Sequence, residues 1–320
     1  MKSRTILDIF NEIYVYICCL IKGSTGFSPC HRKKRLMRQV KKAIGALQIV
    51  TVRLYLNTLS MLSVKKAGNT TIRLFGSPRK GLLLDADREF LKSAKWETLQ
   101  YDGHNIQTYH WEGSGTRILL AHGWESNSAR WKPLIALLKA QNYDIVSMDA
   151  PRHGATGGRY FGAVLYGEMM NIVVQHFKPE ALVGHSIGGF TATLCLHRFK
   201  KTTPSVSHLV LLATPSNLRH IFELFLNVVG LNQRVRQGYY AEFQRLVGGS
   251  TEEFTAENFC RDLNLKSLII HDRTDDVAKF EDSAKIHAAL NGSEYVVTEG
   301  YGHRLQDVFI YEKIIDFLKL

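Results

Sequence analysis

The chain has 320 residues, of which 45% are hydrophobic and 22% are charged. A chain of this length can bury a full core and can hold one large α/β domain with an appendage. Its five cysteines follow no disulfide or metal-binding spacing, which excludes a disulfide framework or a zinc module and favours a reducing, cytoplasmic location. They are Cys18, Cys19, Cys30, Cys195 and Cys260.

The positive charge is concentrated at one end of the chain. The formal net charge is +12, yet residues 1–95 hold 19 Lys and Arg against 5 Asp and Glu, whereas residues 96–320 hold 22 against 24. We therefore predict a basic N-terminal helical extension over residues 1–95 and a second, larger domain over residues 96–320.

The first apolar run, residues 13–21, has nine residues and is too short to span a bilayer. Asp8 and Glu12 interrupt any extension of the run towards the N-terminus. A secretory signal would need a longer apolar core and a clearer cleavage site than residues 22–26 offer. An alternative is that residues 1–36 are a poorly ordered leader ahead of a start at Met37.

A basic cluster at residues 31–42 precedes an apolar-rich helical stretch at residues 43–64. Lysine and arginine beside an apolar helical face suit anionic lipid headgroups, so peripheral contact with an anionic membrane is one expectation. The alternative is that the helix packs on the rest of the chain and leaves its charges in water. Aromatic and basic residues do not interleave here, so we expect no nucleic-acid binding.

Each of the next two predicted strands ends in a short loop that contains histidine and glycine. Residues 117–121 form an apolar strand signal that ends in His-Gly-Trp at residues 122–124, and a helix is predicted to start near Ser128. A second strand, residues 143–148, ends in Asp-Ala-Pro-Arg-His-Gly at residues 149–154.

Residues 184–188 read Gly-His-Ser-Ile-Gly, between a strand signal at residues 180–183 and a helical pattern at residues 187–198. This context predicts a nucleophile elbow, in which Gly184 and Gly188 let strand and helix pass closely and Ser186 is exposed on the turn. The amide groups of Ile187 and Trp124 are then the candidate oxyanion donors. The alternative is a glycine-rich connector with an idle serine.

A long helical insertion, about residues 214–262, follows a strand at residues 209–213. Its apolar residues recur at helical spacing and predict a cap that either roofs a site or forms only its own core. They are Ile221, Leu224, Phe225, Val228, Tyr239, Tyr240, Phe243 and Leu246.

An activated serine needs a base, and the base needs an acid to orient it. In proteins with this elbow the acid follows the serine along the chain, and the histidine follows the acid. A strand at residues 267–271 opens into a loop with Asp272, Asp275 and Asp276. We predict Asp275, because it lies far enough past the strand to reach a neighbouring loop. Asp272 and Asp276 remain alternative acids. If they are not the acid, they are expected to form a solvated acidic turn that caps the next helix.

The predicted base is His303, which follows a strand at residues 294–298 and precedes a terminal helix at residues 305–320. Glycines before it let its loop approach the elbow. The competing histidines are expected to satisfy backbone groups, or, for the one that ends a strand, to contact the acid loop. They are His122, His153, His185 and His271.

Taken in order, these motifs resemble the α/β-hydrolase superfamily over residues 96–320, and most of all its esterase and lipase-like serine hydrolases. The resemblance implies a mostly parallel eight-stranded sheet with helices on both faces, acyl-enzyme chemistry, and no metal or organic cofactor. Two positions depart from the usual pattern, because Arg152 and Asp272 stand where the family commonly has glycine.

The sequence thus predicts a serine hydrolase that cleaves carboxylic esters of small molecules, with Ser186 as nucleophile, His303 as base and Asp275 as the orienting acid. Thioester, amide or carbon–carbon bond hydrolysis and perhydrolysis are alternatives on the same scaffold. A protein of a different class, which binds a membrane surface without catalysis, is also compatible with the pattern.

Overall fold

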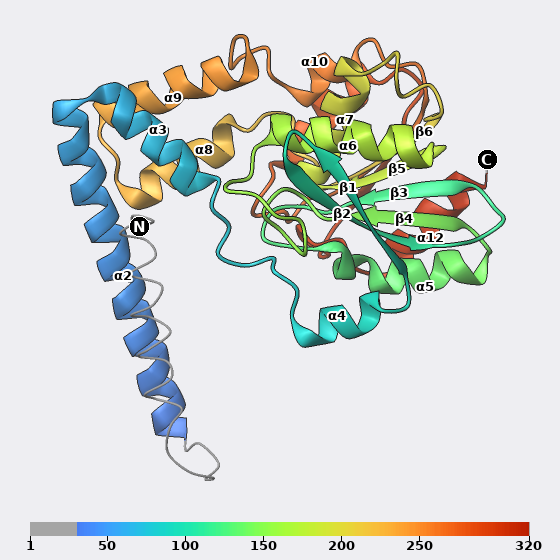
Figure 1. Ribbon diagram of the computed structural model, residues 1–320, viewed down its shortest axis with the longest axis horizontal. Helices are drawn as coiled ribbons and strands as arrows, with labels where there is room; N and C mark the ends of the chain where they lie inside the picture. Colours follow the sequence, from blue (N-terminus) through green and yellow to red (C-terminus); the bar gives the residue numbers. More distant parts are fainter. Residues whose placement is uncertain (1–30, 320) are drawn as a thin grey trace.

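The computed structural model describes residues 31–319, and side chains from residue 45 onward. The predictions for the apolar run at residues 13–21 and for Cys18, Cys19 and Cys30 lie outside the described residues. Figure 1 shows a twisted central sheet between two layers of helices, with a long helix, α2 (His31–Leu62), that extends away from the body.

The central sheet has eight strands in the order β1-β2-β4-β3-β5-β6-β7-β8. Strand β2 runs antiparallel to both of its neighbours, and all other neighbouring strands are parallel. The predicted mostly parallel eight-stranded sheet is therefore confirmed. The strands are β1 Lys95–Tyr101, β2 His104–Trp111, β3 Arg117–Ala121, β4 Asp144–Met148, β5 Ala181–His185, β6 His208–Leu212, β7 Lys266–Asp272 and β8 Glu294–Thr298.

Both faces of this sheet are apolar because successive side chains of a strand point to opposite faces. In β3, Ile118 and Leu120 belong to one buried cluster, and Leu119 and Ala121 to the other. Helices α6, α7, α10 and α11 cover one face, and α4, η1, α5 and α12 the other. Their bounds are α4 Asp85–Leu91, η1 Ser128–Trp131, α5 Lys132–Ala140, α6 Ala163–Phe177, α7 Ile187–Arg198, α10 Ala256–Cys260, α11 Phe280–Ala289 and α12 Val308–Leu318.

The N-terminal helices pack on the predicted cap. Helix α3 (Val64–Phe75) lies along α9 (Gln233–Val247), and α2 contacts both α9 and α8 (Arg219–Val229). The backbones of α3 and α9 touch, because a Cβ added at Gly68 would lie 2.1 Å from the carbonyl carbon of Gly238. Residues 64–75, expected in a separate extension, therefore share one helical layer with the insertion at residues 214–262.

Polar side chains fix the end of α2 to the start of α9. The backbone N–H of Asn232 donates to Asn57 Oδ1 over 2.9 Å, and the guanidinium of Arg234 donates to the carbonyl of Ser60 over 3.0 Å. Leu56, only 1% exposed, packs into the core beside them. The C-terminal half of α2 is therefore held firmly against the cap helices.

The close helix crossing leads to a stability prediction. In Gly68→Val, the added side chain meets the backbone of α9, so we expect the free energy of unfolding to fall by about 1–3 kcal/mol. Gly45→Ala in α2 is the matched control, since a Cβ there meets nothing within 4 Å and alanine favours the helix. Urea unfolding of both variants tests this; equal stability of Gly68→Val and the wild type would contradict the crossing.

Candidate active site

Ser186 lies on the turn between β5 and α7, as predicted for a nucleophile elbow. Its backbone has φ 54° and ψ −125°, a strained conformation for a residue other than glycine. Its N–H donates to the carbonyl of Leu212 over 2.8 Å, which ties the turn to the end of β6. The sheet thus holds the strained turn in place and presents the serine at its carboxyl edge.

Close backbone contacts explain the two predicted elbow glycines. A Cβ at Gly184 would lie 2.5 Å from Cα of Gly189, and one at Gly188 would lie 2.4 Å from the carbonyl oxygen of Ala121. Only glycine fits at either position without moving the backbone. The helix after the serine can therefore start directly against strands β5 and β3.

The three residues predicted to react together meet in the structure. His303 Nε2 lies 3.1 Å from Ser186 Oγ, and His303 Nδ1 lies 2.8 Å from Asp275 Oδ2. The Asp275 side chain is fully buried, and that of His303 is 16% exposed. The loops after β5, β7 and β8 thus place a hydroxyl, an imidazole and a carboxylate in one line of hydrogen bonds.

Asp275 is held as a carboxylate. Its Oδ1 accepts hydrogen bonds from the backbone N–H groups of Val277 and Ala278, at 2.8 and 2.9 Å. His271 Nε2 lies 3.2 Å from its Oδ2, which confirms the expected contact with the acid loop. Burial alone would raise the pKa of Asp275, but hydrogen bonds from His271 and His303 and the charge of His303 outweigh it and hold the pKa below its usual value.

Asp272, the first alternative acid, connects two loops instead of touching the base. Its carboxylate accepts from the backbone N–H of Thr274 at 2.9 Å, the hydroxyl of Thr298 at 2.8 Å and the backbone N–H of Tyr301 at 3.0 Å. Burial would raise the pKa of Asp272, but these hydrogen bonds hold it below its usual value. Asp276, the other alternative, is exposed. Of the three acids, Asp275 is the one in contact with His303.

We expect Asp272→Ala to lower the free energy of unfolding by about 3 kcal/mol at neutral pH, because buried N–H groups lose their acceptor. The native pKa of Asp272 lies below its unfolded value, so its contribution is present above about pH 4 and is lost as the pH falls further. Urea unfolding at pH 7 and pH 3 should show the gap to the wild type narrowing in acid. A gap that is equal at both values, or a similar loss in Asp276→Ala, would contradict this role.

Three of the competing histidines satisfy backbone groups, as expected, and two of these, His122 and His153, each satisfy a pair. His122 Nδ1 donates to the carbonyl of Gly123, and its Nε2 accepts from the N–H of Ala150. His153 makes the same kind of pair with the carbonyl of Pro151 and the N–H of Glu125. Burial lowers the pKa of each to about 4, so both rings are neutral and shape the loops after β3 and β4.

His185 contacts the backbone of the predicted base, His303. Its Nε2 donates to the backbone carbonyl of His303 over 2.8 Å. Burial, with a further contribution from the charge of Arg130, lowers the pKa of His185 well below its usual value and keeps the ring neutral. The residue before the serine therefore positions the loop that carries the base.

The loop at residues 122–124 runs beside the elbow, since a Cβ at Gly123 would lie 3.0 Å from Cβ of Ser186. Ile187 is the first residue of α7. The roles of the Trp124 and Ile187 amides as oxyanion donors stay predictions.

The indole of Trp124 stacks on Phe75 of α3, with ring centroids 5.8 Å apart, and meets the edge of Phe161 at 5.1 Å. An aromatic wall thus surrounds this loop. No local sequence pattern indicates this role of Phe75, because the contact joins segments that are distant along the chain.

Arg152 stands where the α/β-hydrolase family commonly has glycine. Its φ is 61°, a left-handed conformation that glycine adopts without strain. The main chain therefore keeps the turn that the resemblance implied, and the departure concerns only the side chain.

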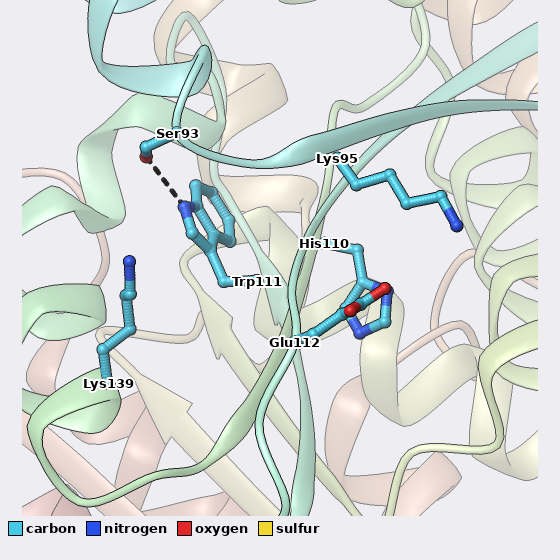
Figure 2. A pocket seen from close by; sticks show the side chains of 6 residues that line it. All are labelled: Ser93, Lys95, His110, Trp111, Glu112 and Lys139. Atoms are coloured by element: carbon cyan, nitrogen blue, oxygen red, sulfur yellow. Dashed lines mark hydrogen bonds between the residues drawn. The ribbon is translucent and has the colours of Figure 1, made fainter.

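A cavity of about 400 Å³ lies at the opposite edge of the sheet, near the start of β1 and the end of β2 (Figure 2). Trp111, which donates to Ser93 Oγ there, pairs with Ile145 near the amino end of β4. Ser186 lies at the carboxyl end of the parallel strands, so this cavity is separate from the candidate active site. Within residues 31–319, no group of three or more His, Cys, Asp or Glu side chains is arranged to hold a metal ion.

A mostly parallel sheet with a strained serine after β5 and an acid and a histidine after β7 and β8 defines the α/β-hydrolase class of fold and site. The comparisons with known proteins agree. The family model for the alpha/beta hydrolase fold matches residues 116–266. We conclude that the chain belongs to the α/β-hydrolase superfamily.

Two curated relatives and one solved structure illustrate the similarity. A pimeloyl-[acyl-carrier protein] methyl ester esterase from Pectobacterium carotovorum is 37% identical over 92 residues, which are 28% of this chain and 35% of that protein. The uncharacterized hydrolase YugF of Bacillus subtilis is 25% identical over 266 residues, 68% of this chain and 96% of its own. An esterase from Exiguobacterium antarcticum, 19% identical, has a TM-score of 0.55 and covers 71% of this chain and 100% of its own. The match to the methyl ester esterase therefore spans only about a third of that enzyme, and the solved structure supports the fold alone.

Proposed function

We propose that the chain is a serine hydrolase that cleaves carboxylic esters through an acyl-enzyme intermediate. The observation that carries this proposal is the unbroken line of hydrogen bonds from Ser186 through His303 to the buried Asp275. A serine, an imidazole and a carboxylate in this order can activate the hydroxyl as a nucleophile.

In the first half-reaction, Ser186 Oγ attacks the acyl carbon while His303 Nε2 takes the hydroxyl proton. Asp275 accepts the Nδ1–H, which fixes the reactive tautomer and stabilises the imidazolium that forms. The amides of Trp124 and Ile187 are assigned to the negative oxygen of the tetrahedral intermediate. His303 then gives its proton to the departing alcohol, and the acyl group stays on Ser186.

In the second half-reaction, water attacks the acyl-enzyme. His303 takes a proton from this water and later returns it to Ser186 Oγ, so that the carboxylic acid leaves and the enzyme is restored.

Two observations favour an ester with an apolar acyl group. The aromatic rings of Trp124, Phe75 and Phe161 are packed together beside the elbow, and such a wall suits hydrocarbon better than charged groups. A curated relative is named as a methyl ester esterase, which supports a carboxylic ester over other acyl compounds. Thioester, amide, carbon–carbon bond and perhydrolase activities remain the alternative reactions of the same three residues.

A panel of substrates with one shared acyl group tests the proposal. We expect the p-nitrophenyl ester of a medium-length acid to be cleaved with a kcat/KM at least about tenfold above those of the matching thioester and anilide. Esters from acetate to palmitate then give the preferred acyl length. Faster cleavage of the thioester would replace the ester assignment, and no turnover of any member would argue for a non-catalytic protein.

A further inference from the structure

The α2 helix carries an apolar stripe that faces solvent. Leu47, Leu54 and Met61 are 63%, 63% and 72% exposed, and the half-exposed Val50 lies between the first two. Spacings of three, four and seven residues place these side chains on one face of a helix. Contiguous exposed apolar side chains that lie beside polar residues often mark a site of interaction with a protein or a membrane.

The other face of α2 is already occupied. Leu56 is buried, and Asn57 and Ser60 bond to the start of α9. The helix is therefore fixed by its inner face, and no residue from 45 to 319 covers the outer stripe. In Figure 1, α2 extends away from the body of the structure. None of the helices in the described part of the chain is long and apolar enough to cross a membrane.

The charge of the same segment is strongly one-sided. Between Glu12 and Asp85 the sequence has 14 Lys and Arg and no Asp or Glu, and residues 32–42 alone hold seven of these cations. An amphipathic helix with many basic residues and an exposed apolar face binds in the plane of an anionic bilayer surface. Each basic residue near such a surface strengthens binding.

We infer that α2 is a membrane-docking surface, on which Leu47, Val50, Leu54 and Met61 enter the interface of an anionic lipid bilayer while the basic segment at residues 31–42 contacts the headgroups. A second copy of this chain fits less well, because it would bring the same acid-free, basic helix against the first. A nucleic acid would leave the leucines without an apolar partner. This inference does not depend on the proposed hydrolase function.

Flotation of the full chain with lipid vesicles tests the inference. We expect flotation with vesicles of phosphatidylcholine containing about one third phosphatidylserine, about tenfold less with phosphatidylcholine alone, and a decline at high salt. Leu47→Glu/Leu54→Glu should lower binding about tenfold or more. Lys41→Glu/Lys42→Glu should do the same, without altering the stripe.

The matched control is Leu82→Glu/Leu84→Glu, which makes the same change in charge at exposed leucines, 66% and 70% exposed, outside α2. This control should bind anionic vesicles within about twofold of the wild type. All variants should have the same thermal unfolding midpoint as the wild type.

Each of the following results would overturn the inference. The full chain fails to float with anionic vesicles, or the Leu82→Glu/Leu84→Glu control loses as much binding as Leu47→Glu/Leu54→Glu. Flotation occurs only after removal of residues 1–30, or light scattering shows a dimer that Leu47→Glu/Leu54→Glu abolishes. A shift of duplex DNA at a salt concentration where anionic vesicles do not bind would instead assign the surface to nucleic acid.

Discussion

Replacing Ser186 by alanine should lower kcat/KM for an activated ester by about 10⁶-fold, because the nucleophile itself is removed. The fold should be unaffected, since alanine accepts the same backbone strain as serine and the lost hydroxyl has one hydrogen bond, to His303. Steady-state kinetics with a p-nitrophenyl ester, together with a thermal unfolding curve, measure both effects.

Ser126→Ala is the control, since Ser126 lies on the loop after β3 near the same edge of the sheet. It should keep the wild-type rate within a few-fold. Should Ser186→Ala retain more than a few per cent of wild-type turnover while the fold is intact, another residue must be the nucleophile.

Asp275→Asn should lower kcat by about 10⁴-fold with little change in KM. An asparagine can present its NH₂ to His303 Nδ1, in which case Nε2 carries the proton and cannot accept the one from Ser186. Asp276→Asn is the matched control, because Asp276 is an exposed neighbour and its substitution makes the same change in charge. A loss of equal size in both variants would mean that charge, and not the contact with His303, is responsible.

The pKa of Asp275 gives this variant a second signature. Its native pKa lies below the value in the unfolded chain, so the ionised carboxylate stabilises the native state at neutral pH. This contribution is lost as the pH falls below about 4 towards the native pKa. The stability difference between Asp275→Asn and the wild type should therefore shrink in acid and stay constant from about pH 6 to 8.

Local patterns were sufficient to place the core of the site. Strands at residues 117–121 and 294–298 and the helix at residues 187–198 have the predicted bounds, because apolar periodicity and flanking glycines determine them locally. Ser186, Asp275 and His303 could be chosen in advance because each follows a parallel strand, and the ends of such strands meet at one edge of the sheet.

Other features could not be read from the sequence because they depend on contacts between distant segments. The hairpin of β1 and β2 and the packing of α3 on α9 are of this kind, as the tight Gly68–Gly238 crossing has no signature in either helix alone. The same holds for Phe75 against Trp124 and for His185 against the carbonyl of His303. These tertiary contacts decide how the N-terminal region relates to the site.

The most direct test of the central claim is covalent capture with a fluorophosphonate, followed by peptide mapping. The account predicts one adduct per chain, on Ser186, which is lost in Ser186→Ala and formed far more slowly in His303→Ala, because His303 Nε2 is 3.1 Å from the hydroxyl that it activates. An adduct on a different serine, or labelling of Ser186 at the same rate without His303, would contradict the proposed relay.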